Sequence, residues 1–170
     1  MATSTYDLLE SVTLATAASS VTFSSISATG KGDLVAVWDV LSAPGSGTIQ
    51  LENLFNSDTG NNYNRVIMAG NGSTTSSASS SGVDSLQLFT GGRVTESIRG
   101  LFTLQIMDYA ATDKHKSALG RCSATNDELT AGAGRWADTS AITSVTIQPT
   151  LGSVSFAIGS TFNLYQLVSE

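Results

Sequence analysis

Short runs of apolar or alternating residues recur along the whole chain, and turn-forming residues separate them. In 154–158, Val154, Phe156 and Ile158 alternate with small residues, and Gly159 then turns the chain. Such alternation is typical of a half-buried strand. The only helix-like segments are 123–130 and part of 108–116, and neither has an apolar period longer than two turns. Strands at this spacing without helices between them predict an all-β sandwich or barrel.

About eleven runs have the length and composition of a strand. The predicted strands are 8–14, 21–26, 33–41, 48–55, 63–69, 86–89, 100–107, 115–122, 141–148, 153–158 and 161–168. The run 33–41 is apolar at nearly every position, so it is expected to be a central strand covered on both faces. Trp38 lies in this run and is expected in the core.

The amino-acid composition excludes several classes of protein function. The chain has 170 residues, enough for one domain with a full core. Eight Lys and Arg against 14 Asp and Glu leave a net charge of −6, which excludes the basic face of a nucleic-acid-binding protein. One cysteine and one histidine rule out an internal disulfide and most zinc sites. No cofactor is expected, and Cys122 is interpreted as a small buried hydrophobic residue.

The organisation along the chain indicates a single domain over 1–170, with a short N-terminal tail at 1–5. Residues 71–82 read NGSTTSSASSSG, and this Ser-rich segment is expected to be an exposed loop because it has little apolar area to bury. The N-terminus lacks the basic start and apolar run of a signal peptide. No uncharged stretch has the composition of a membrane-spanning helix. The chain is therefore expected to be neither secreted nor membrane-bound.

Five segments together resemble a family of small bacteriophage virion structural proteins. They are 6–26, 55–66, 105–121, 134–147 and 159–167. The resemblance implies a jelly-roll-like β-sandwich that assembles as a homotrimer. Related modules occur as capsid decorations and as distal parts of tail fibres. One departure from the family pattern is Asn53-Leu54, where a basic residue is expected before Phe55.

A loop rich in oxygen-bearing side chains follows Phe55. Asn56, Asp58 and Asn62 surround a glycine in NSDTGNN, as in loops that bind Ca²⁺. However, the loop has a single carboxylate, and Asn, Asp and Gly also suit a tight turn. We favour the structural turn over the metal site.

Charge is concentrated between residues 108 and 116. The cluster consists of Asp108, Asp113, Lys114, His115 and Lys116. A general base could be built from His115 and Asp113, but no nucleophile motif or second acid accompanies them. Mixed charges of this kind also suit a strand edge or a subunit contact. We favour a contact with another subunit or with the viral shell.

Aromatic residues near glycines offer a possible ligand platform. Trp136 follows Arg135 in the sequence GAGRW, and it could stack on a sugar, with Tyr63 contributing a second ring. A tryptophan in such a position is more often at the edge of the core, and this is the reading we favour for Trp136.

Two functions are favoured, and depolymerase activity is a third, minor option. The first is a non-enzymatic virion protein on the outer particle surface, a capsid decoration or cement protein that binds through multivalent protein–protein contacts. Its expected partners are copies of itself, as a homotrimer, and virion proteins such as the major capsid protein or a tail adaptor. The second is a receptor- or glycan-binding module of a tail fibre or spike, with a host surface glycan as partner. Both place the chain in the virion, after synthesis in the host cytoplasm.

Overall fold

The computed structural model describes residues 5–30, 32–89, 93–123 and 128–167. Every regular element within these ranges is a β-strand, and all strand pairs are antiparallel. The prediction of an all-β chain is therefore confirmed. Because the described residues form no helix, they contain none that is long and apolar enough to cross a membrane.

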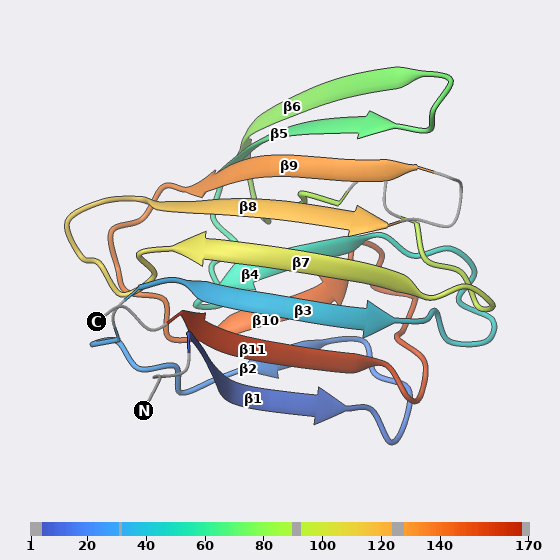
Figure 1. The fold of residues 1–170 in the computed structure, drawn as a ribbon, viewed down its shortest axis with the longest axis horizontal. Helices are drawn as coiled ribbons and strands as arrows, with labels where there is room; N and C mark the ends of the chain where they lie inside the picture. The colour runs from blue at the N-terminus through green and yellow to red at the C-terminus, as the bar shows by residue number, and fades with distance from the viewer. Residues whose placement is uncertain (1–4, 31, 90–92, 124–127, 168–170) are drawn as a thin grey trace.

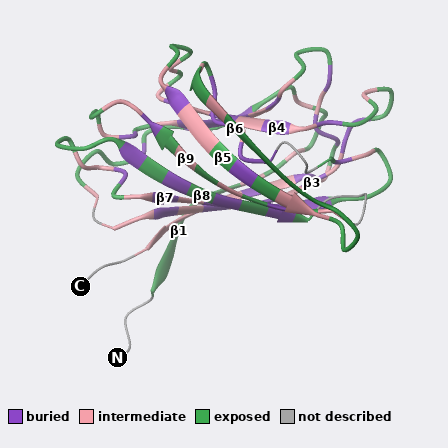
Figure 2. Ribbon diagram, turned by 90° about the horizontal axis from the view of Figure 1, so that it is seen from above, coloured by how far each residue is buried: buried purple, intermediate pink, exposed green. Residues whose placement is uncertain are grey.

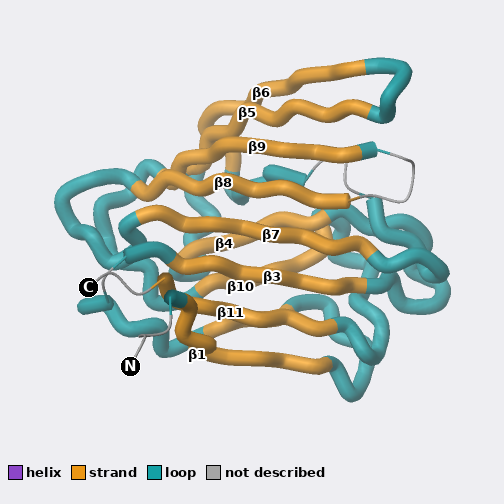
Figure 3. The backbone as a smooth tube through the Cα atoms, viewed as in Figure 1, coloured by secondary structure: helices purple, strands orange, loops and turns teal. Residues whose placement is uncertain are grey.

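The strands follow one another along the chain with loops between them (Figure 3). They are β1 (Tyr6–Thr13), β2 (Val21–Phe23), β3 (Leu34–Val40), β4 (Leu51–Phe55), β5 (Tyr63–Gly70), β6 (Thr75–Val83), β7 (Gly100–Met107), β8 (Lys116–Ser123), β9 (Leu129–Trp136), β10 (Val145–Pro149) and β11 (Thr161–Leu167).

Two sheets of unequal size pack into a sandwich. Eight strands form the large sheet in the order β1-β11-β3-β7-β8-β9-β5-β6, and three form the small sheet in the order β2-β10-β4. Figure 1 shows the small sheet behind β7, β3 and β11, toward the β1 end of the large sheet. The expected single-domain antiparallel β-sandwich is thus confirmed, with the strands divided eight to three.

The core lies between the two sheets. In β3, Leu34, Ala36 and Trp38 point into it and are fully or almost fully buried. The Trp38 ring meets Phe89 edge-on at a centroid distance of 5.7 Å, and Phe89 meets Phe102 at 5.2 Å. Edge-to-face contacts of this kind stabilise the packing beyond the apolar area that they bury. The predicted core position of Trp38 is confirmed.

Residues 86–89 form a cover over the inner side of β8 and β9. They were predicted to be a strand, but only Leu86 forms an isolated bridge, to Asn53. Leu86, Leu88 and Phe89 are fully buried. A Cβ at Gly120 would lie 2.8 Å from the Phe89 ring, so the cover requires glycine beneath it. The prediction was wrong because a short apolar run can be buried without joining a sheet.

Two strands of the large sheet were not predicted. The Ser-rich segment forms β6 from Thr75 onward, pairing with β5 from Gly70↔Thr75 to Tyr63↔Val83. It is exposed as expected, but the loop prediction was wrong for residues 75–82. Strand β9 was also missed, and residues 129 and 130 of the expected helix-like segment belong to it. Residues 124–127 of that segment and 1–4 of the predicted tail lie outside the described residues.

The run 153–158 was also predicted to be a strand. Phe156 forms isolated bridges to Ala18 and Ser42 only, so this segment closes the edge of the sandwich as a loop. Phe156 nevertheless packs on Phe162 of β11 at a centroid distance of 5.1 Å, and both rings are fully buried. Alternation therefore identified Val154 and Phe156 as buried, but it was wrong for Ile158, which is 64% exposed, and it assigned the backbone to the wrong state.

Candidate functional site

The outward side of the large sheet has no second layer over it. Strand β3 was expected to be covered on both faces, yet Val35 and Val37 point away from the core and remain partly exposed. The expectation was wrong for this side. We call the outward side of the eight-stranded sheet the open face.

Strand register aligns the residues of the open face in rows across the sheet. One row consists of Leu8, Tyr165, Val35, Gln105, Leu119, Ala133, Val66 and Ser79. The next row consists of Ser11, Asn163, Val37, Thr103, Arg121, Ala131, Met68 and Ser77. Apolar side chains predominate between the ends of the rows, with Gln105, Thr103 and Arg121 among them, and serine lies at three of the four ends.

Large exposed hydrophobic side chains gather on this face. Among the described residues eleven are exposed, and seven of them point outward from the large sheet. The seven are Tyr6, Leu8, Val66, Met68, Leu101, Leu119 and Leu129. Isolated exposed apolar residues are ordinary, but a contiguous group marks a binding surface.

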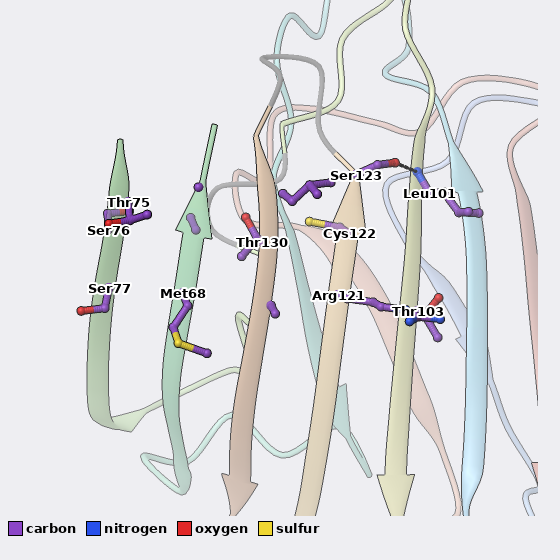
Figure 4. Close-up of a pocket in the computed structure, with 14 residues that line it drawn as sticks. Met68, Thr75, Ser76, Ser77, Leu101, Thr103, Arg121, Cys122, Ser123 and Thr130 are labelled. Carbon is purple, nitrogen blue, oxygen red and sulfur yellow. Dashed lines mark hydrogen bonds between the residues drawn. The ribbon is translucent and has the colours of Figure 1, made fainter. Parts of the chain in front are cut away.

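The open face is hollowed at its centre. Two adjoining hollows of about 910 and 930 Å³ share Met68, Thr103, Arg121 and Ala131 in their walls. Figure 4 shows one of them, with Met68 of β5, Thr130 of β9 and Arg121 of β8 on successive strands. Ser77 of the edge strand β6 pairs with Met68 and also lines this hollow.

Arg121 is an isolated cation in this apolar surrounding. It is the only charged residue in the two rows, all of whose members the structure describes. Within the described part of the chain its guanidinium has neither a hydrogen bond nor an ion pair. A guanidinium presents several donors in a planar fork that suits a carboxylate. The open face thus combines apolar area with a positive charge at its centre that has no partner among the described residues.

The proposed calcium loop holds itself together. Asp58 accepts hydrogen bonds from the backbone of Gly60 at 2.8 Å, from Asn62 Nδ2 at 2.9 Å and from Trp136 Nε1 at 2.7 Å. The bonds from Asn62 and Trp136 hold the pKa of Asp58 below its usual value. Asn56 turns elsewhere, with its side-chain amide donating to Ala141 O at 2.9 Å. The three predicted ligands therefore serve a turn and its anchoring.

The aromatic ligand platform is not available. Tyr63 and Trp136 are buried, with their rings stacked at a centroid distance of 6.5 Å. The Tyr63 hydroxyl accepts from the backbone of Phe55 at 3.0 Å, and burial raises its pKa. Trp136 is a core residue, as we favoured, and its prediction as a ligand contact was wrong, as was that of Tyr63. Arg135 remains exposed at the end of β9.

The charged cluster separates into exposed and buried parts. Lys114 Nζ bonds Asp108 Oδ2 at 2.9 Å, and this hydrogen bond raises the pKa of Lys114. Asp113 and His115 are also exposed. Lys116 is instead buried, and its ammonium donates to Lys114 O at 3.1 Å and Thr139 O at 3.3 Å. Lys116 cannot make the subunit contact predicted for it, because its alternating strand position places it inside.

No cluster among the described residues gathers three or more His, Cys, Asp or Glu side chains that could hold a metal ion. Cys122 is buried and free, as predicted, and its burial raises the pKa of the thiol to about 11. The open-face residues were missed by sequence reasoning. Their signal was the apolar character of 33–41 at both odd and even positions.

Comparisons with known proteins add little. No family model matches the chain, and no curated protein matches it. Among solved structures, it is similar to the alginate lyase Aly36B in complex with an alginate tetrasaccharide, at 9% identity and a TM-score of 0.33. The match covers 81% of this chain and 71% of that one. A likeness this slight does not inform the function.

Proposed function

We propose that the protein is a non-enzymatic structural component of a phage virion, a decoration or cement protein of the outer capsid surface. It acts by protein–protein contacts made through the open face. The observation that carries this proposal is the gathering of seven exposed large hydrophobic side chains on one side of one sheet. The virion context rests on the sequence resemblance.

The size of the apolar strip supports a protein partner. From β11 to β5 six neighbouring strands span about 24 Å, at about 4.8 Å per strand. The two rows then cover on the order of 350 Å² of sheet. A stable protein interface buries about 800 Å² on each partner and has an apolar centre with a polar rim. The two rows have the extent of such a centre, and Ser77 and Ser79 at one end and Ser11 and Asn163 at the other suit a rim.

Many copies of a weak contact together bind a protein firmly to a viral shell. When identical subunits sit at symmetry positions of a shell, each contact raises the effective concentration for the next one. The serine-rich edge strand β6 and the few charges suit close neighbours without strong repulsion. The glycan-binding alternative loses its main support, because Tyr63 and Trp136 lie inside the fold.

The test is a substitution on the open face. Met68→Asp places a carboxylate at the middle of the strip, where Met68 is 63% exposed, so the fold should persist. Binding of the purified variant to particles that lack the protein should fall at least about tenfold. Ile158→Asp is the matched control, because Ile158 is 64% exposed but lies in a loop outside the sheet.

Particle labelling tests the location. Antibody against the protein should decorate the faces of the capsid shell in electron micrographs. Labelling confined to the tail tip would overturn the decoration assignment and favour a fibre module. Unchanged binding of Met68→Asp would show that the open face is not the attachment surface.

A further inference from the structure

Strand β1 is exposed on both of its sides. All of Tyr6–Ser11 is exposed, and the strand is held in place by pairing with β11. Figure 2 shows β1 running out from the rest of the sandwich, coloured as exposed. The small sheet ends with β2, which leaves the inward side of this strand start uncovered. An edge strand of this kind is a ready contact site for another chain.

A bulge in β1 places its acidic side chains on one side of the strand and Tyr6 and Leu8 on the other. The register shifts between Leu8, paired with Tyr165, and Glu10, paired with Leu164. Successive residues of a strand point to opposite sides, so the shift places Asp7 and Glu10 on the same side. That side is the inward one, because Leu164 points into the core. Tyr6 and Leu8 point to the open face.

The carboxylates of Asp7 and Glu10 are opposite in charge to Arg121, which lies on the other side of the sheet. Within the described residues neither Asp7 nor Glu10 has an ion pair or a side-chain hydrogen bond, and neither has Arg121. Leu9 is exposed at the bulge between the two acids. One copy thus carries an acidic and apolar projection on one side and a hollow with a central arginine on the other.

This arrangement favours one kind of contact between copies. A two-fold contact of open face on open face would bring Arg121 close to its own counterpart, and like charges in an interface oppose association. A contact of the open face with the inward side of a neighbour's β1 brings opposite charges together. Such a contact joins different surfaces of the two copies, and it can close into a ring.

We propose that copies of this chain associate head to tail, with residues 6–10 of one copy seated in the open-face hollow of the next and Asp7 or Glu10 paired with Arg121. This inference rests on the proposed function of the open face and names its occupant as a second copy. The homotrimer implied by the sequence resemblance is one closed form of this contact.

Charge reversal tests the pairing. Wild-type protein should sediment as a discrete oligomer at micromolar concentration. Arg121→Glu and the double variant Asp7→Lys/Glu10→Lys should each raise the dissociation constant at least about tenfold. The triple variant that combines all three changes should restore it to within about threefold of wild type, because every contact regains opposite charges. Asp84→Lys is the matched control, because Asp84 is exposed and lies outside the walls of both hollows, and it should not change the dissociation constant.

The outcomes separate this inference from the proposed function. A monomeric wild type, or charge variants that associate as wild type does, would overturn the head-to-tail contact. A triple variant that fails to recover would overturn the pairing of these residues, provided its circular dichroism and melting match wild type. Because Met68 lines the hollow, the sedimentation of Met68→Asp is measured beside its particle binding. Lost particle binding by an intact oligomer supports the open face as the capsid contact, and loss of both supports the contact between copies. Particle binding that persists would overturn the proposed function and leave the contact between copies to the charge rescue.

Discussion

The two sides of the large sheet are built from the same strands, but one side is buried and the other is exposed to solvent. On the inner side of β7, Phe102 is completely buried against Trp38 and Phe89, whereas its neighbour Leu101 is 53% exposed on the open face. In β3 the inner residue Trp38 is buried, and the outward Val37 is only partly covered. Both sides are apolar, yet one has a covering layer and the other has none.

This difference shows that hydrophobicity alone does not define the core of the isolated chain. An antiparallel sheet with one solvent-facing side normally alternates apolar and polar residues. Strand β3 breaks the alternation with Val35 and Val37 on the outward side. The exposed apolar side is therefore better explained by a partner than by the stability of the single chain.

The sharpest test of the comparison is a pair of adjacent substitutions in β7. Phe102→Asp buries an unpaired charge and removes an aromatic ring from the core, which should cost about 5 kcal/mol or more and leave the chain largely unfolded. Leu101→Asp should change the free energy of unfolding by less than about 1 kcal/mol, because its side chain already faces solvent. Urea unfolding followed by tryptophan fluorescence measures both.

A large loss of stability in Leu101→Asp would break the comparison. It would mean that the open face is part of the folding core of the single chain. A folded Phe102→Asp with a native melting temperature would break it from the other side.

The regular strands of the sandwich could be predicted because their side chains carry the information. Strands β3, β7, β10 and β11 have large apolar residues on the inward side, and they lie within the predicted runs except for Pro149 at the end of β10. Burial of a side chain depends on its own size and polarity, so a local pattern is sufficient. The buried positions of Phe156 and Phe162 follow in the same way.

Strands β6 and β9 could not be predicted because they are defined by their neighbours. Strand β6 is mostly serine and exists through its pairing with β5. Strand β9 contains Gly132 and Gly134, which read locally as a flexible loop. A Cβ at Gly132 would lie 3.1 Å from the carbonyl oxygen of Leu88, so glycine is needed beneath a distant segment of the chain. Such contacts have no signature within a short window of sequence.

The sequence also failed to predict the candidate functional site correctly, for a related reason. The oxygen-rich loop around Asp58 resembles a cation site when read alone, but the fold brings Trp136 to it from 78 residues away. The open face could not be predicted either, because no single segment of the sequence contains it. Its rows assemble one or two residues from each of eight strands, and only the strand order places them side by side.

A second test compares neighbouring small residues of β9. Gly134→Ala should destabilise the fold by about 1–3 kcal/mol, because a Cβ there would meet Leu86 and lie 3.2 Å from the carbonyl oxygen of Asn64. Ala133→Val points to the open face, where there is room, and should change stability by less than about 0.5 kcal/mol. Thermal melts by circular dichroism give the difference between the two.

Equal effects at the two positions would contradict the close packing of residues 86–89 on β9. A stabilised Gly134→Ala would do so most strongly, since alanine restricts the unfolded chain more than glycine does. A destabilised Ala133→Val would instead show that the outward side of β9 is already covered.

The test with the smallest expected effect on the fold compares two proteins, each with a single thiol, on opposite sides of β8. Cys122 is 5% exposed on the inner side, and burial raises its pKa to about 11. Leu119→Cys, combined with Cys122→Ala, moves the only thiol to the open face, where its pKa should stay near the ordinary value of about 8.5. At pH 8 about one part in a thousand of Cys122 would be thiolate, against about a quarter of the new cysteine.

Because the thiolate is the reacting form, labelling with iodoacetamide should be at least about a hundredfold faster on the open face. The rate for Cys122 should still rise between pH 8 and 10, whereas that of the new thiol should level off above its pKa. Assembly sharpens the result further. If the open face is occupied in the oligomer, then dilution to the monomer should speed labelling of the new cysteine and leave Cys122 unchanged. Labelling of the new cysteine that ignores dilution would mean that position 119 stays open in the assembled state.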